Sequence, residues 1–120
     1  MANPSAGFGG AGTEVLRRAY VDDMSNSEVT LLTGLANHIY TVLSVLFIST
    51  DSSDKLIKMY VDVDLSGTDI FILNEQSLPG KSTFSFNDRL VLTETDKLHA
   101  ICTTTTGIDI WVSYIDQQLA

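Results

Sequence analysis

Cysteine, proline and glycine are sparse in this sequence. It has one cysteine, Cys102, with two prolines and eight glycines among 120 residues. One cysteine cannot form a disulfide within the chain, and it excludes a metal site built from several thiolates. A small secreted scaffold held together by disulfides is therefore excluded, and assembly in a cytoplasm fits the cysteine content better.

Basic residues are also few. Seven Lys and Arg stand against fifteen Asp and Glu, which gives a formal net charge of −8. Phosphate groups repel so acidic a protein, so neither nucleic acid nor an anionic membrane surface is expected as its main partner. No apolar run reaches the ~18 residues that a membrane-spanning helix needs, and the N-terminus lacks the pattern of a signal peptide. We therefore expect a soluble protein made inside a cell.

Helical spacing of apolar residues is nearly absent, and strand patterns take its place. The stretch 38–50 has no charge, Gly or Pro and is rich in β-branched residues, which is typical of a strand covered on both faces. Residues 55–64 and 108–116 alternate apolar with polar side chains, as a strand with one solvated face does. Turn residues recur about every 8–12 positions, which is typical of a sandwich or barrel.

These patterns predict one all-β domain over residues 19–120. The expected architecture is an antiparallel β-sandwich of about eight strands with jelly-roll-like topology. Residues 13–21 are either a further strand or, over 14–19, a short helical turn.

Two hairpins are expected from the turn chemistry. One joins the strand 38–50 to the strand 55–64 through an Asp- and Ser-rich turn. The other joins the strand 97–104 to the strand 108–116.

Residues 1–18 are expected to form an extended, Gly-rich N-terminal arm. Four of the eight glycines lie within residues 1–12, where Phe8 is the single aromatic residue. Ordering such a segment costs more backbone entropy than its own contacts return. We therefore expect a neighbouring subunit to hold the arm, with Phe8 as its anchor. An arm lying over its own domain is the alternative.

Charge is unevenly distributed between the arm and the body. Residues 1–21 contain Glu14, Arg17 and Arg18, a net charge of +1, so residues 22–120 carry −9. The arginine pair could dock the arm on an acidic neighbour, and the alternative is that both side chains are simply solvated.

One segment has the opening of a calcium-binding loop. Asp62-x-Asp64-x-Ser66-Gly67 places carboxylates at alternate positions before a glycine, as an EF-hand loop does. The twelfth position of such a loop is Leu73, where a bidentate Glu is required. The segment is therefore expected to be a turn.

No other residues form a pattern typical of catalysis. His38 and His99 are the two histidines, and their spacing matches no zinc motif. Cys102 stands at an odd offset from His99 along one strand, so the two face opposite sides, and Cys102 is expected to pack as a small apolar residue. We expect no catalytic residue, no cofactor and no metal, and hence no enzyme.

Two aromatic residues, Tyr60 and Trp111, fall on strand faces opposite the main aliphatic rows. Such residues fill subunit interfaces more often than they stack on sugar rings. The expected interface residues are therefore Phe8, Arg17, Arg18, Tyr60 and Trp111. A carbohydrate-binding module that uses Trp111 or Tyr60 is the alternative.

Two blocks resemble a pattern in small virion structural proteins of tailed phages. They are residues 84–100, with Asp96-Lys97-Leu98 in a turn, and the strand 108–115. The opening 9–18 also looks like the N-terminal arms of those proteins. The resemblance implies an oligomeric β-sandwich on a phage particle, with no catalytic residues to transfer. It implies a capsid decoration (cement) protein, or a component of the neck, tail or fibre attachment.

Together these observations predict a non-enzymatic virion structural protein, made in the host cytoplasm. Capsid decoration is the first expectation, because an acidic body suits an outward surface and an arm can clamp adjacent subunits. The expected partners are further copies of the chain, as a trimer, and the major capsid protein or other virion structural proteins. The alternatives are a neck, tail or fibre component and a receptor-binding carbohydrate module.

Overall fold

The structure is a computed structural model that describes residues 13–24, 27–64, 66–102 and 107–119. No helix long and apolar enough to cross a membrane occurs among these residues. Their regular elements are nine strands: β1 (Thr13–Met24), β2 (Val29–Thr33), β3 (His38–Ser49), β4 (Lys55–Val63), β5 (Thr68–Leu78), β6 (Thr83–Phe86), β7 (Leu90–Thr93), β8 (Lys97–Cys102) and β9 (Ile108–Gln118).

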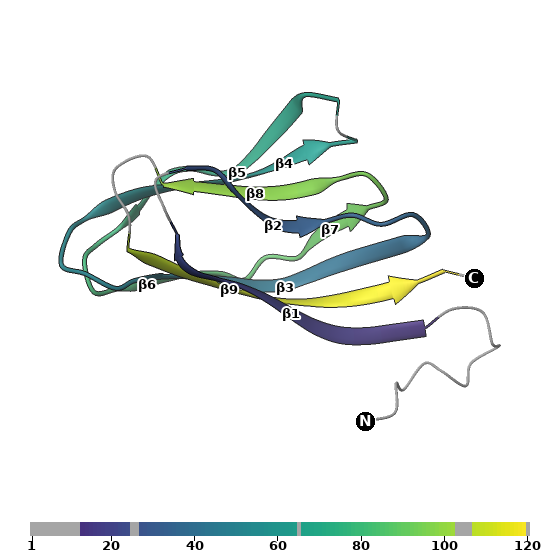
Figure 1. Ribbon diagram of the computed structural model, residues 1–120, viewed down its shortest axis with the longest axis horizontal. Helices are drawn as coiled ribbons and strands as arrows, with labels where there is room; N and C mark the ends of the chain where they lie inside the picture. The colour runs from purple at the N-terminus through teal and green to yellow at the C-terminus, as the bar shows by residue number, and fades with distance from the viewer. Residues whose placement is uncertain (1–12, 25–26, 65, 103–106, 120) are drawn as a thin grey trace.

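The strands form two antiparallel sheets that pack face to face (Figure 1). The five-stranded sheet has the order β1-β9-β3-β6, with β7 also paired to β3, and the four-stranded sheet has the order β2-β8-β4-β5. The first four strands alternate between the two sheets, as do β8 and β9, which is jelly-roll connectivity. The expected jelly-roll-like sandwich is confirmed.

The strand beside β3 is interrupted, which explains why there are more strands than the expected eight. β6 pairs with Val45–Ile48 of β3, and β7 pairs with Ile39–Val42 of the same strand. Together they occupy the place of one jelly-roll strand.

Both expected hairpins are wrong. The strands β3 and β4 belong to opposite sheets, and so do β8 and β9. The polar turn after β3 therefore crosses from one sheet to the other. Lys55 stabilises this crossing, because its buried Nζ donates hydrogen bonds to Asp51 Oδ1 at 2.5 Å and Ser49 Oγ at 3.2 Å. The hairpin that does form is β4–β5, closed by the pair Val63 and Thr68.

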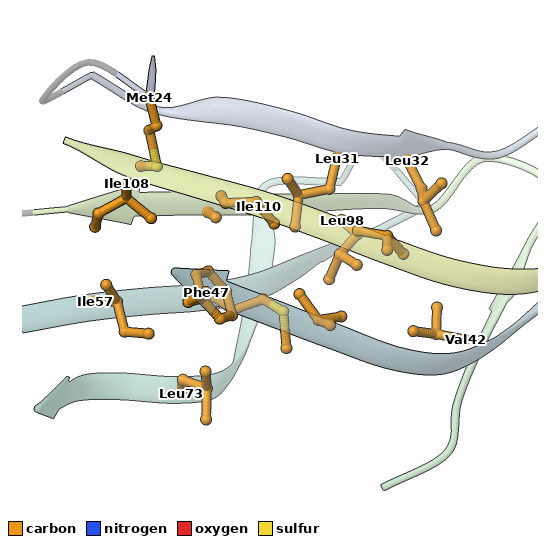
Figure 2. Packing of buried hydrophobic residues seen from close by; sticks show 14 of the residues in the cluster. Met24, Leu31, Leu32, Val42, Phe47, Ile57, Leu73, Leu98, Ile108 and Ile110 are labelled. Atoms are coloured by element: carbon orange, nitrogen blue, oxygen red, sulfur yellow. The ribbon is translucent and has the colours of Figure 1, made fainter. Parts of the chain in front are cut away.

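The core lies between the inner faces of the two sheets, where alternate residues of each strand meet (Figure 2). Phe47 of β3 and Ile110 of β9 face Ile57 of β4 and Leu98 of β8, all fully buried. Burying each such side chain contributes about 1.5–3 kcal/mol. Cys102 is also part of this core, as expected.

Residues 13–21 form a strand, so the helical turn considered for residues 14–19 is wrong. β1 runs along β9 from the pair Thr13–Gln118 to the pair Val21–Ile110. Residues 13–18 of the expected arm thus lie in the sheet, and residues 1–12 lie outside the described residues.

Candidate interaction surface

The outer face of the five-stranded sheet carries large apolar side chains in contact with solvent. On β1, Leu16 and Tyr20 point away from the core and are 69% and 61% exposed. Trp111 of β9 lies directly opposite Tyr20 and is 39% exposed. Leu46 of β3 continues this row on the other side of Trp111. Apolar side chains gathered on one exposed face are typical of a contact surface.

Three of these outward side chains form a group that we name the Arg18 cluster: Arg18, Tyr20 and Trp111. The two rings stack with centroids 5.9 Å apart and an interplanar angle of 21°. The Arg18 guanidinium carbon lies 5.1 Å from the Trp111 centroid and 5.6 Å from the Tyr20 centroid. A cation over aromatic rings at an exposed site contributes about 0.5–1 kcal/mol, so the cluster holds a positive charge in place on the sheet surface.

A cavity of about 280 Å³ opens next to the Arg18 cluster. Tyr20 and Trp111 line one part of it, and Asp22, Ile48 and Asp109 line another. The surface therefore combines apolar area with charges of both signs.

The edge of the sheet is part of the same surface. β1 is the outermost strand, and among the described residues its ladder partner is β9 alone. Its other side has no strand partner among the described residues along the twelve residues of β1. A long edge strand of this kind is ready to pair with another strand.

Arg17 points to the opposite face of β1 from Arg18. Its Nε donates a hydrogen bond of 2.9 Å to Oδ2 of Asp116, a buried carboxylate whose other oxygen lies 2.6 Å from His38 Nδ1. Burial and then the Asp116 charge raise the pKa of nearby Tyr40. Arg17 thus stabilises the end of the sandwich, and the two arginines do not act as one basic patch.

Tyr60 lies on the outer face of the other sheet and is 8% exposed. Its hydroxyl donates to the Glu28 carboxylate, and its ring lies 5.0 Å from the Phe71 ring and 5.2 Å from the His99 ring. Burial first, and then the Glu28 hydrogen bond, raise the pKa of Tyr60. Side chains of its own chain therefore cover much of Tyr60, and it shares no surface with Trp111.

Of the five expected interface residues, the structure brings together Arg18 and Trp111. Arg17 and Tyr60 lie elsewhere, and Phe8 is outside the described residues. Sequence reasoning missed Tyr20, which completes the cluster. The alternation of Leu16, Arg18 and Tyr20 was the available signal, and the helical alternative over residues 14–19 obscured it.

No group of three or more His, Cys, Asp or Glu that could hold a metal occurs within residues 13–24, 27–64, 66–102 and 107–119. The segment from Asp62 to Gly67 connects β4 to β5, and the Gly67 amide donates to Asp62 Oδ1 at 3.3 Å. This carboxylate therefore stabilises a turn.

The chain is similar to several solved structures, and one of them supports the fold. The chain is similar to a protein of the disulfide-linked pili of Bacillus endospore appendages, with a TM-score of 0.54 and 13% identity over 91% of each chain. It is less similar to VP2 of infectious bursal disease virus (TM-score 0.49, 11% identity, 89% of this chain and 38% of that one). A pentameric capsid protein from metagenomic phage sequences is also similar (TM-score 0.41, 20% identity, 85% of this chain and 66% of that one).

The chain therefore spans only part of both capsid proteins, about 38% of VP2 and 66% of the phage protein. No protein-family model matches it, and no curated protein sequence matches it. The class that the fold defines is a jelly-roll β-sandwich.

Proposed function

We propose that this chain is a non-enzymatic structural subunit of a phage virion, in the role of a capsid decoration protein. The observation that carries the proposal is the exposed outer face of the five-stranded sheet, with the Arg18 cluster beside an open strand edge. A surface of this composition favours a protein partner. The resemblance of residues 84–100 and 108–115 to small tailed-phage virion proteins supports a partner within a phage particle.

In this role the chain binds across the joints between capsid subunits and stabilises the shell by mass action. The acidic body faces outward, and residues 1–12, with Phe8 as anchor, contact a neighbouring subunit. The partners are the major capsid protein and further copies of the chain, for which we propose a trimer as the working assembly. The mature location is the virion, after synthesis in the host cytoplasm.

The likeness to a pilus protein raises a second assembly, a filament of identical subunits. The match to that protein covers 91% of each chain, and its pili are linked by disulfides. The single cysteine of this chain, Cys102, is fully buried in the core. Disulfide links between folded copies are therefore not part of our proposal.

The carbohydrate-binding alternative rests on Trp111. Sugar recognition by stacking needs an open aromatic face, and Tyr20 and Arg18 both already contact this ring. Binding of wild-type protein to a glycan array, lost in W111A, would favour this alternative over a protein contact.

Deleting residues 1–12 tests the decoration role. The deletion stops before Thr13, because residues 13–18 are paired in the sheet. We expect the shortened chain to keep its thermal unfolding midpoint and to fail to join particles, with F8A giving a partial loss. Full incorporation of the shortened chain contradicts the role of the arm. Copy number then separates the roles, because on the order of hundreds per particle indicates decoration, whereas about a dozen indicates a neck or tail component.

A further inference from the structure

We propose that β1 pairs antiparallel with β1 of a second copy, about a two-fold axis at Tyr20. The two five-stranded sheets then join edge to edge. The two-fold pair is a contact separate from the trimer proposed above, because a three-fold trimer cannot contain it. It rests on the proposed function only for the particle in which the pair acts.

The charge pattern of the edge strand carries the argument. Residues 17–23 read Arg-Arg-Ala-Tyr-Val-Asp-Asp, so the charges change sign on reversal about Tyr20. In an antiparallel pair with Tyr20 opposite Tyr20, Arg18 of each copy faces Asp22 of the other. Directly opposite side chains on one face lie about 4.5–5.5 Å apart at Cβ, and opposite charges there stabilise the pair.

Arg18 and Asp22 are placed for this contact. Both are exposed residues of β1, one on each side of Tyr20. Asp22 opens the bulge between Val21 and Met24 and lines the same cavity as Tyr20 and Trp111. The second charge pair of the motif contributes less. Arg17 already binds Asp116, and Asp23 lies in a bulge where its amide donates to Asp109 Oδ1. The Arg18–Asp22 pair, formed twice, is therefore the main determinant.

Registers centred on Arg18 or Arg17 fit the charges poorly, and the register centred on Leu16 is less favourable for another reason. A two-fold axis normal to the sheet keeps the outer faces of both copies on the same side. The axis must then lie between the two copies of one residue, and that residue defines the register. An axis at Arg18 places Arg18 against itself and Glu14 against Asp22. An axis at Arg17 places Arg17 against itself. An axis at Leu16 pairs Glu14 with Arg18. It leaves the exposed Tyr20 ring without a facing residue within β1.

Pairing at Tyr20 also accounts for the exposed aromatic surface. The two Tyr20 rings meet at the axis, each already stacked on its own Trp111, so four rings form one row across the joined sheet. The open backbone edge of β1 gains hydrogen-bond partners at the same time. Both consequences follow from one contact between identical copies.

Charge reversal tests the pairing. R18D alone and D22R alone each place like charges opposite one another, so we expect the dissociation constant of each to rise at least about tenfold. In a mixture of the two variants every acidic position faces a basic one, so we expect a one-to-one hetero-pair of near wild-type affinity. Sedimentation equilibrium measures the affinity, and native mass spectrometry identifies the hetero-pair.

Two controls isolate the charge effect. R18Q loses the same contact with Tyr20 and Trp111 as R18D but adds no repulsion, so it should weaken association less. E14K changes a charge that has a partner within β1 for the axes at Arg18 and Leu16 but none for the axis at Tyr20, so it should leave association unchanged. Thermal unfolding of every variant shows whether it is folded.

The outcomes separate this proposal from the proposed function. A wild-type protein that stays monomeric up to about 1 mM, or reversal variants that do not rescue each other, overturns the β1 pairing. Incorporation into particles by a monomeric protein overturns the pairing alone. Paired protein that never joins particles overturns the decoration role alone.

Discussion

Tyr20 stacks on Trp111 across the β1–β9 pair, with the ring centroids 5.9 Å apart. The two residues are direct cross-strand neighbours, and both rings are on the solvent side of the sheet. The stack therefore joins the edge strand to the sheet from outside, independently of the core.

We expect this stack to have a measurable coupling energy. In a double-mutant cycle of Y20A, W111A and the combined variant, the coupling should be about 0.5–1.5 kcal/mol, because aromatic pairs add this much beyond area burial. Urea unfolding gives the four free energies. V91A removes an exposed residue of the same sheet that lies on β7, and should cost less than about 0.5 kcal/mol. Strict additivity of the two aromatic substitutions would contradict the coupling.

Asp116 should be the costliest acidic residue to remove near β1. It is buried and lies within hydrogen-bond distance of Arg17 and His38, so D116A leaves two polar groups without their acceptor. We expect a loss of about 1–3 kcal/mol in the free energy of unfolding. D88A, in an exposed loop, is the matched control. Equal losses for the two variants would argue against a stabilising role for this carboxylate.

The crossing between β3 and β4 should make the protein sensitive to acid. Hydrogen bonds from Lys55 and then Ser53 hold the pKa of Asp51 well below its usual range. A carboxylate with a lowered folded-state pKa stabilises the fold above its unfolded pKa of about 4, and this contribution is lost as pH falls further.

Urea unfolding between pH 7 and pH 2 measures this slope. D51N should flatten the fall in stability below about pH 4, because it removes the titrating group. K55M should flatten it too, because it removes the partner that lowers the pKa. A slope that persists in both variants would assign the acid sensitivity to other carboxylates.

Gly80 should tolerate no side chain. A Cβ at this position would lie 2.2 Å from the backbone oxygen of Ser52, so G80A must push the turn before β6 away from the sheet crossing. We expect a cost of about 1–3 kcal/mol, measured as a lower thermal midpoint. G67A is the comparison, because its Cβ would have no heavy atom within 4 Å and only the positive φ of +81° opposes it. A smaller cost for G80A than for G67A would contradict the steric argument.

Much of the fold could be predicted from residue patterns. Alternation assigned the inner and outer faces of residues 55–64 and 108–116, and turn residues divided the chain into strands of about the right length. Strand partners could not be predicted in this way. The turn before Lys55 has the chemistry of a hairpin, but turn chemistry fixes a change of direction and not the sheet that the next strand joins.

The candidate surface was predicted in part. Trp111 and Arg18 carry signals of their own, an outward aromatic on an alternating strand and a charge near the start of the chain. Their proximity is not local information, because 93 positions separate them and the β1–β9 register brings them together. Tyr20 was missed for a different reason, because the helical alternative over residues 14–19 obscured the alternation of this strand.

The interrupted strand opposite β1 has a consequence for growth of the sheet. At the edge opposite β1, the five-stranded sheet ends in the four-residue strands β6 and β7. These strands are too short and too divided to pair with a long strand of another molecule. Only the edge at β1 is continuous. If two copies use that edge on each other, the five-stranded sheet has no long edge left to extend, so association by this route is self-limiting.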